Sequence, residues 1–155
     1  MLEYPTLDSL FSTHFDAWGV ARIEPIEDEI DRLKEWIGNG YHAEMQYMAR
    51  NIELRANPCE LLPNARSMIM VLMNYYPHEW QPDNLPRIAA YAYGNDYHHI
   101  VKSKLTQIAE EINKIAPHKY AIFCDSAPVM ERAWAVRAGL GWIGRNGMLV
   151  NPKLG

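Results

Sequence analysis

Apolar side chains recur at helical spacing twice within the first forty residues. One stripe covers residues 7–15, and a second covers residues 26–37, directly after Pro25. Side chains three and four residues apart share one face of an α-helix. The pattern therefore predicts two amphipathic helices, with a short strand between them near residues 19–23.

Three later segments have the character of strands. Residues 67–76, SMIMVLMNYY, are apolar without alternation and lie between turn residues. Such a run is typical of a strand buried on both faces, so we expect a central strand here. Residues 87–94, RIAAYAYG, and 119–125, KYAIFCD, are further strand candidates, each leading into a polar or glycine-containing loop.

Two helices are predicted among these strands. Asp96 can cap a long helix whose apolar stripe would pack on a sheet. The stripe consists of Ile100, Leu105, Ile108, Ile112 and Ile115. A second helix is expected to open at Ser126 and Pro128, run through residues 129–138, and end at Gly139, where a left-handed residue is most easily accommodated. The order of elements predicts an α/β sandwich, with a mixed sheet flanked by helices.

Composition narrows the class of protein. A chain of 155 residues with 48% hydrophobic content can bury one sizeable core, which predicts one domain over residues 1–155. The net charge of −4 gives no general attraction to a polyanion. The longest apolar run, residues 68–73, is far shorter than the roughly 20 residues that cross a bilayer. No signal-peptide pattern opens the chain, so we expect a cytoplasmic protein without a membrane partner.

Metal binding by this chain alone is not expected. Cys59 and Cys124 lie far apart without CxxC spacing, which excludes a zinc ribbon or an iron–sulfur site built here. His98 and His99 are adjacent, so they point to different faces of a helix, and no HxxxH or HxxE partner follows them. These histidines, within the polar segment YAYGNDYHH at residues 91–99, are expected to be structural or to face a ligand.

The densest signal for chemistry lies in the last thirty residues. Four glycines fall within nine residues, from Gly139 to Gly147. Such a segment can be a helix end followed by a hairpin turn, or it can bring backbone N–H groups close to a flat ligand. The string GLGWIG is neither a Walker loop nor a GxGxxG motif behind a strand. Both interpretations stay open.

Asp125 is the strongest candidate for a catalytic group. It follows an apolar strand candidate, where partial desolvation would favour the protonated carboxyl that a general acid needs. The alternative is an ordinary helix N-cap, with Glu131 and Arg132 as a solvated pair one turn later. A third polar segment, residues 40–51 with Arg55, can be a loop packed on the core or a wall around a large planar cofactor.

Taken together, these segments resemble the epoxyqueuosine reductases. The strings GYHAEMQYMARN, NYY, YAYGNDYH and DSAPVMERAWAVRAGLGWIGRN occur in the order that this family shows, with residues 55–63 between the first two. The family is similar to the corrinoid domain of reductive dehalogenases, and the resemblance implies a fold related to flavin-binding nitroreductases. It also implies a bound cobalamin without a histidine lower ligand.

The resemblance further implies an activity and roles for individual residues. The family reduces epoxyqueuosine in tRNA to queuosine, the last step of queuosine biosynthesis. Asp125 would donate a proton to the departing oxygen. The resemblance places Tyr97 and His98 close to the corrinoid. The remaining residues that it places along the corrinoid are Arg55, Ala89, Asn146 and Leu149.

The chain departs from the family at its end. It stops at Gly155, before any CxxCxxCxxxCP run, so two 4Fe-4S clusters and a helical-repeat tail are expected only in a missing C-terminal part. We therefore expect an N-terminal corrinoid-binding domain, monomeric, that does not turn over alone and meets tRNA mainly through the missing part. The alternatives are a flavin-dependent nitroreductase-like oxidoreductase and a non-catalytic corrinoid-binding module in which Asp125 is only a cap.

Overall fold

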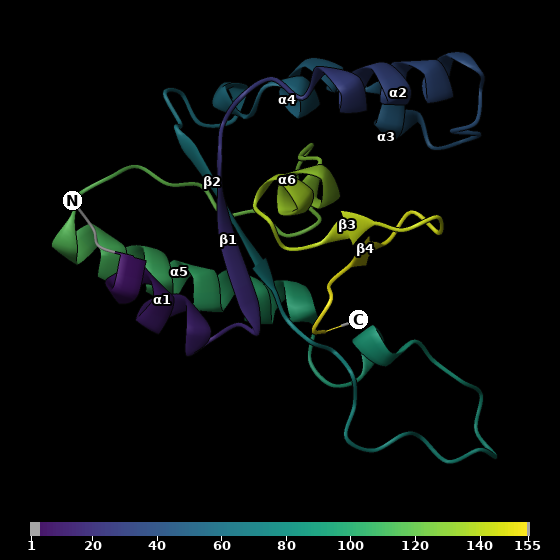
Figure 1. The fold of residues 1–155 in the computed structure, drawn as a ribbon. Helices are drawn as coiled ribbons and strands as arrows, with labels where there is room; N and C mark the ends of the chain where they lie inside the picture. Colours follow the sequence, from purple (N-terminus) through teal and green to yellow (C-terminus); the bar gives the residue numbers. More distant parts are fainter. Residues whose placement is uncertain (1–3, 155) are drawn as a thin grey trace.

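The computed structural model describes residues 4–154, so the ends of the predicted domain at residues 1–3 and 155 lie outside it. In chain order the elements are α1 (Tyr4–Ser12), β1 (Ala17–Arg22), α2 (Glu27–Gly38), α3 (Gln46–Ala49), α4 (Ile52–Ala56), η1 (Pro58–Glu60), β2 (Ser67–Leu72), η2 (Ala90–Ala92), α5 (Tyr97–Ile115), α6 (Glu131–Arg137), β3 (Trp142–Ile143) and β4 (Leu149–Val150). Figure 1 shows them around a central pair of strands.

The central pair, β1 and β2, is antiparallel and separates two hydrophobic clusters. Ala17 lies opposite Leu72, and Arg22 lies opposite Ser67. In Figure 1, α1 and α5 lie on one side of the strands, while α6 lies on the other and α2 crosses one end. The cluster around α2 and α6 contains Ala21, Ile26, Ile30, Leu33 and Trp134. The cluster around α1 and α5 contains Phe11, Phe15, Ile108 and Ile112.

Most of the predicted elements are confirmed. Both N-terminal helices form, although α1 ends at Ser12, and the strand between them is β1. Asp96 caps α5 by accepting a hydrogen bond from the His98 N–H at 2.9 Å. Gly139 has a φ of +77°, as expected for the residue that ends α6. The α/β fold class is therefore confirmed, but the sheets within residues 4–154 are two antiparallel pairs, β1–β2 and β3–β4, rather than one mixed sheet.

Several predictions about local structure were wrong. Residues 87–94 form no strand but a loop containing the short helix η2, and residues 119–125 pair with no other strand among the described residues. A strand needs a neighbour for its backbone groups, and within residues 4–154 neither segment is paired with one. The strand at residues 67–76 ends at Leu72, since beyond it Asn74 donates its N–H to the Asp16 carboxylate instead.

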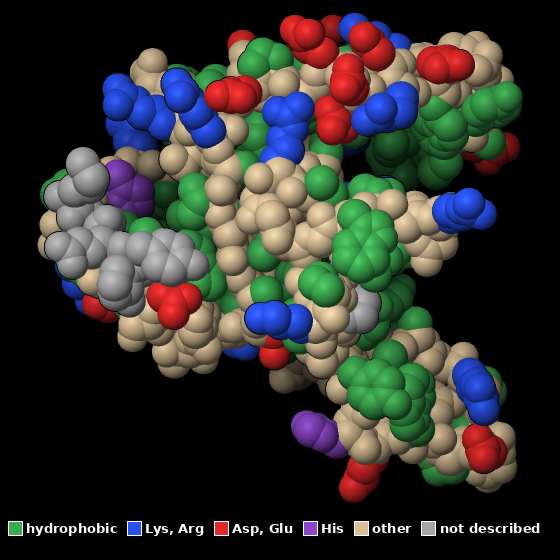
Figure 2. Space-filling model, in the orientation of Figure 1, with side chains coloured by type: hydrophobic (Ala, Val, Ile, Leu, Met, Phe, Trp, Pro, Cys, Tyr) green, Lys and Arg blue, Asp and Glu red, His purple; other side chains and the backbone are tan. Residues whose placement is uncertain are grey.

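No helix among the described residues combines the length and the apolar character that crossing a membrane requires. Acidic side chains gather over α2 at the top of Figure 2, while the long loop between β2 and α5 projects at the opposite end. The helix that carries these acidic side chains does not line the cavity described next.

Candidate active site

A cavity of about 990 Å³ lies between β2, α5 and the segment that precedes α6. Ligand sites in proteins commonly enclose about 300–1,000 Å³, so this cavity has room for a large ligand. Apolar side chains from β2 and α5 form much of its lining. Its polar residues include Asp125, Glu131, Tyr91 and Tyr97. The cavity thus combines a large apolar surface with a few groups that can bind or transfer protons.

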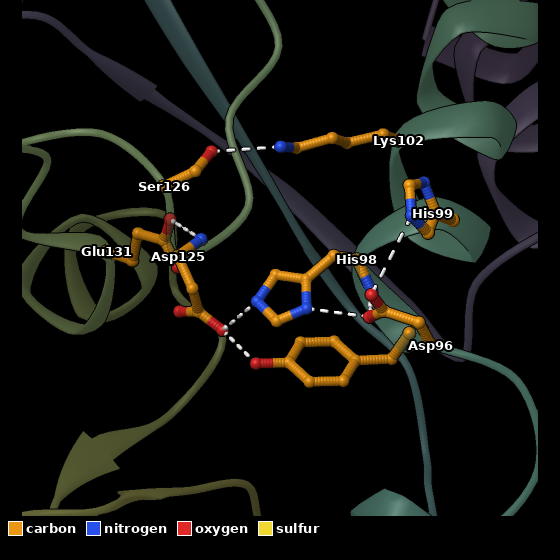
Figure 3. A network of polar contacts seen from close by, with 8 residues as sticks. Asp96, His98, His99, Lys102, Asp125, Ser126 and Glu131 are labelled. Atoms are coloured by element: carbon orange, nitrogen blue, oxygen red, sulfur yellow. Dashed lines mark hydrogen bonds and ion pairs between the residues drawn. The ribbon is translucent and has the colours of Figure 1, made fainter.

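Asp125 lies at this cavity with its backbone in the left-handed region, at a φ of +54°. Its Oδ2 accepts a hydrogen bond from the Tyr97 hydroxyl at 2.5 Å. The same oxygen lies 3.9 Å from His98 Nε2. Figure 3 shows the aspartate and the histidine ring turned toward each other. The Asp125 side chain is 52% exposed, so the desolvation expected at this position is not present within the described residues.

The N-terminal turn of α5 holds the groups that face Asp125. Asp96 Oδ1 lies 2.7 Å from His98 Nδ1, so the imidazole ring lies between two carboxylates. This hydrogen bond, together with the cap to the His98 N–H, lowers the pKa of Asp96 below its usual range. The ring of Tyr97 stacks on that of His98 at a centroid distance of 4.0 Å. The cap therefore also fixes the orientation of the two side chains nearest to Asp125.

Glu131 holds the backbone of the Asp125 loop. Its Oε1 accepts a hydrogen bond from the Asp125 N–H at 2.9 Å, as Figure 3 shows. Burial raises the pKa of Glu131 above its usual value. The interpretation of Asp125 as the cap of the next helix was wrong, because α6 begins at Glu131 and its N-cap position is Met130, which makes no side-chain cap. The interpretation of Glu131 as half of a solvated pair was also wrong.

The neighbours of Asp125 in sequence are likewise ordered. Burial raises the pKa of the Cys124 thiol to about 11, so this thiol stays protonated at neutral pH. Ser126 accepts a hydrogen bond from Lys102 Nζ on α5 at 2.9 Å. Hydrogen bonds from Tyr97 and Lys102 thus connect Asp125 and Ser126 to α5. The Tyr97 pKa is raised chiefly by its hydrogen bond to Asp125, so its hydroxyl remains a donor.

The structure does not bring every predicted site residue to this cluster. Tyr97 and His98 contact or face Asp125, as described above. Ala89 lies in exposed, extended backbone just before η2, and Arg55 lies on α4 with its Nε buried and without a hydrogen-bond partner among the described residues. Asn146 lies between β3 and β4, where its side chain accepts a hydrogen bond from the Met148 N–H. Leu149 is the first residue of β4.

The glycine-rich segment forms a hairpin. Gly139 ends α6, and β3 and β4 follow as an antiparallel pair. A Cβ at Gly141 would lie 2.1 Å from the Val150 carbonyl oxygen, so this glycine permits a close backbone approach within the hairpin. Arg132 donates a hydrogen bond to the Gly147 carbonyl and joins α6 to the hairpin turn. The helix end and hairpin turn are therefore confirmed, while contact of this backbone with a ligand stays a prediction.

Sequence reasoning missed the role of Glu131, because its contact depends on the left-handed turn at Asp125 and not on helix periodicity.

No group of three histidine, cysteine or acidic side chains that could hold a metal ion occurs among residues 4–154. Fold and site together define an α/β protein with a ligand-sized cavity and a carboxyl group fixed at its edge, an arrangement typical of enzymes.

Comparisons with known proteins give the family. A family model described as "Epoxyqueuosine reductase QueG, DUF1730" matches residues 55–126. The epoxyqueuosine reductase of Leadbetterella byssophila is 43% identical over 142 residues, which cover 91% of this chain and 47% of that protein. The chain belongs to the epoxyqueuosine reductase family, and it spans about half the length of the curated relatives it matches.

Solved structures share the fold. The structure of epoxyqueuosine reductase from Streptococcus thermophilus matches with a TM-score of 0.90 at 23% identity, covering 100% of this chain and 43% of that one. A crystal structure of epoxyqueuosine reductase with an epoxyqueuosine-modified tRNA stem loop matches with a TM-score of 0.84 at 25% identity, covering 97% of this chain and 42% of that one.

Proposed function

We propose that this chain is the corrinoid-binding part of an enzyme that reduces epoxyqueuosine in tRNA to queuosine, with Asp125 as the proton donor. The observation that carries the proposal is the position of Asp125. Its carboxyl group lies at the edge of a large cavity, and Tyr97 and Glu131 fix both its side chain and its backbone. Curated relatives of the chain are named epoxyqueuosine reductase.

The reaction requires protons at a defined place. Removing an epoxide oxygen breaks two C–O bonds and forms a C=C bond, and the oxygen leaves as water after taking up two electrons and two protons. Because the Tyr97 hydroxyl donates a hydrogen bond to Oδ2 of Asp125, the other oxygen, Oδ1, is the place for the carboxyl proton. Asp125 then delivers this proton to the departing oxygen, as a general acid does.

Glu131 and His98 support this transfer in different ways. Glu131 accepts the Asp125 N–H and thereby stabilises the left-handed backbone that points the carboxyl group at the cavity. His98 Nε2 faces the same carboxylate oxygen as Tyr97, and Asp96 holds the other ring nitrogen. His98 therefore places an imidazole ring, oriented by Asp96, beside the Asp125 carboxyl group on its α5 side.

The cofactor we propose is cobalamin. The residues that would hold it are Arg55, Ala89, Tyr97, His98, Asn146 and Leu149. One observation fits a large planar group: a cavity of about 990 Å³ with aromatic side chains in its lining, of which Tyr97 is one. The Arg55 Nε is a buried donor that lacks a partner among the described residues, but Arg55 does not line that cavity. When bound, a reduced cobalamin would supply the two electrons of the reduction.

The partner we propose is tRNA carrying epoxyqueuosine. One solved relative is a crystal structure of epoxyqueuosine reductase with an epoxyqueuosine-modified tRNA stem loop. The chain itself has a net charge of −4, and phosphate backbones are bound mainly by lysine and arginine. We therefore propose most phosphate contacts for the part of the family proteins that this chain does not match. We propose the 4Fe-4S clusters that supply electrons for the same part.

The proton donor is tested with Asp125→Asn in a full-length enzyme that contains this sequence. Conversion of epoxyqueuosine to queuosine in tRNA is followed by mass spectrometry of the digested nucleosides. Loss of a general acid lowers the rate by about two to four orders of magnitude. Asp83→Asn is the matched control, because the Asp83 side chain is 95% exposed and lies outside the cavity. Equal rates for the two variants would refute the role of Asp125.

The cofactor is tested by titrating the chain with cob(II)alamin and, separately, with flavin mononucleotide, following visible absorbance. Saturable binding of cob(II)alamin with a base-off spectrum supports the corrinoid site, because no histidine ligand is proposed. Saturable binding of the flavin alone would instead favour a nitroreductase-like oxidoreductase.

A further inference from the structure

The segment that carries Asp125 has little support from its own backbone. Within the described residues, no hydrogen bond between backbone groups involves residues 119–126. Asp125 also has the left-handed φ of +54°, a conformation that a residue other than glycine keeps only where its surroundings fix it. The position of the Asp125 carboxyl group at the cavity therefore depends on contacts that side chains make.

Three side chains make such contacts. Tyr97 and Glu131 hold Asp125 itself, at its carboxyl group and at its N–H. The third contact lies one residue further along, where Lys102 Nζ donates a hydrogen bond to Ser126 Oγ at 2.9 Å. Figure 3 shows the Lys102 side chain reaching from α5 to Ser126. The loop is thus held on both sides of the Asp125 Cα atom as well as at the carboxyl group.

Lys102 lies beside the cavity and not in it. It follows His98 by four residues, so both side chains leave the same face of α5. The Lys102 side chain is half-buried, and neither Lys102 nor Ser126 belongs to the lining of the cavity. Lys102 is therefore placed to act on the loop, and not on a ligand in the cavity.

Two anchors around a residue fix the direction in which its side chain leaves the backbone. Glu131 fixes the Asp125 N–H, and Lys102 fixes the residue that follows Asp125. Without the second anchor, the peptide group after Asp125 can rotate and carry the carboxyl group away from Tyr97. A general acid must lie within hydrogen-bond reach of the atom that it protonates, so such rotation lowers the rate.

We propose that Lys102 is a positioning residue for the reaction: through its hydrogen bond to Ser126, it holds the loop in the conformation from which Asp125 donates its proton. This inference rests on the role proposed above for Asp125. It gives Lys102 no contact with the substrate or the cofactor.

The test uses Lys102→Met and Ser126→Ala, each made in a full-length enzyme that contains this sequence. Single-turnover conversion of epoxyqueuosine in tRNA is followed by mass spectrometry of the digested nucleosides. Loss of this one hydrogen bond should lower the rate about three- to tenfold in either variant. The double variant should be no slower than either single variant, because both changes remove the same contact. If Lys102→Met does not fold, Ser126→Ala tests the same contact, and Ser126→Thr, which keeps the hydroxyl group, should retain the wild-type rate.

Lys104→Met is the matched control. Lys104 lies on the same helix and donates a hydrogen bond of similar length, 3.0 Å, to the His14 carbonyl oxygen just after α1. This contact does not involve the Asp125 loop, so the variant should keep the wild-type rate. An equal loss of rate in Lys104→Met and Lys102→Met would reflect a general loosening of α5 and would overturn the proposal.

Two further measurements separate positioning from ligand binding. Titration with cob(II)alamin, followed by visible absorbance, should give Lys102→Met the same Kd as the wild type, because Lys102 does not line the cavity. A weaker Kd would make Lys102 part of the ligand site and contradict the inference. In hydrogen exchange followed by mass spectrometry, peptides from residues 124–130 should exchange faster in Lys102→Met than in the wild type. Unchanged exchange would mean that the loop does not depend on Lys102.

The final comparison is made in an Asp125→Asn background. If Lys102 acts through Asp125, Lys102→Met has no further effect once the carboxyl group is lost. A further loss of three- to tenfold would overturn the role of Lys102 and leave the proton donor unaffected. An Asp125→Asn variant as fast as the wild type would instead refute the proton donor, and with it the role of Lys102.

Discussion

The close contact between β1 and α6 leads to a quantitative prediction. A Cβ placed at Gly19 would lie 2.2 Å from the Ala138 carbonyl oxygen. Real Cβ contacts essentially never fall under 3.0 Å, so Gly19→Ala must push α6 and β1 apart by about 1 Å. Overpacking of this kind costs about 1–3 kcal/mol, and the smaller backbone entropy of alanine offsets about 0.5–1 kcal/mol of it.

We therefore expect Gly19→Ala to lower the free energy of unfolding by about 1–2 kcal/mol. For a chain of this size, that corresponds to a fall in Tm of roughly 2–8 °C. Urea denaturation followed by tryptophan fluorescence measures the change. The matched control is Gly38→Ala at the end of α2, where an added Cβ meets nothing within 4 Å and alanine is the better helix former.

A Gly19→Ala variant as stable as the wild type would refute the reasoning, since it would mean that α6 is free to move away from the sheet at no cost. The same variant has a second expected effect. Because α6 begins at Glu131, which holds the Asp125 N–H, a displaced helix shifts the loop that carries the proposed proton donor.

Three further outcomes follow from the site. Burial raises the pKa of Glu131 above its usual 4.5, so the folded chain retains the proton to a higher pH than the unfolded chain does. The free energy of unfolding therefore falls as the pH rises above about 4.5. Glu131→Gln should reduce this fall, as read from urea midpoints measured from about pH 4 to 8. With its pKa raised to about 11, Cys124 should react with iodoacetamide at pH 8 more slowly than the less buried Cys59, as read by peptide mass spectrometry, and equal rates would contradict the buried position. In the full-length enzyme, Tyr97→Phe should slow epoxyqueuosine reduction about three- to tenfold, whereas Tyr91→Phe, which removes no hydrogen bond to Asp125, should not.

Local signals predicted the helices well. For α5, the signals are local to the helix: Asp96 caps it as predicted, and Ile108 and Ile112 of the predicted stripe are buried, whereas Ile115 is 58% exposed. The strands were less predictable, because a strand is completed by a neighbour that is remote in sequence. β2 finds β1, but the equally apolar residues 119–125 have no strand partner among the described residues and remain extended without a ladder.

The candidate site shows the same limit. The position of Asp125 at a cavity was accessible from its place after an apolar segment. Its partners were not, because Tyr97 comes from the first turn of a helix 28 residues earlier and Glu131 reaches back six residues around a left-handed turn. The expected desolvation of Asp125 is not found among the described residues, because its side chain is 52% exposed at the edge of the cavity.

The Tyr97–Asp125 hydrogen bond connects two helices that pack in different hydrophobic clusters, on opposite sides of β1 and β2. Tyr97 lies on α5, which contributes Ile108 and Ile112 to one cluster, whereas Asp125 is held by α6, which contributes Trp134 to the other. The hydrogen bond between their oxygens therefore depends on the position of α5 relative to α6. A relative movement of only about 1 Å breaks such a bond, so the site registers any change in sheet packing.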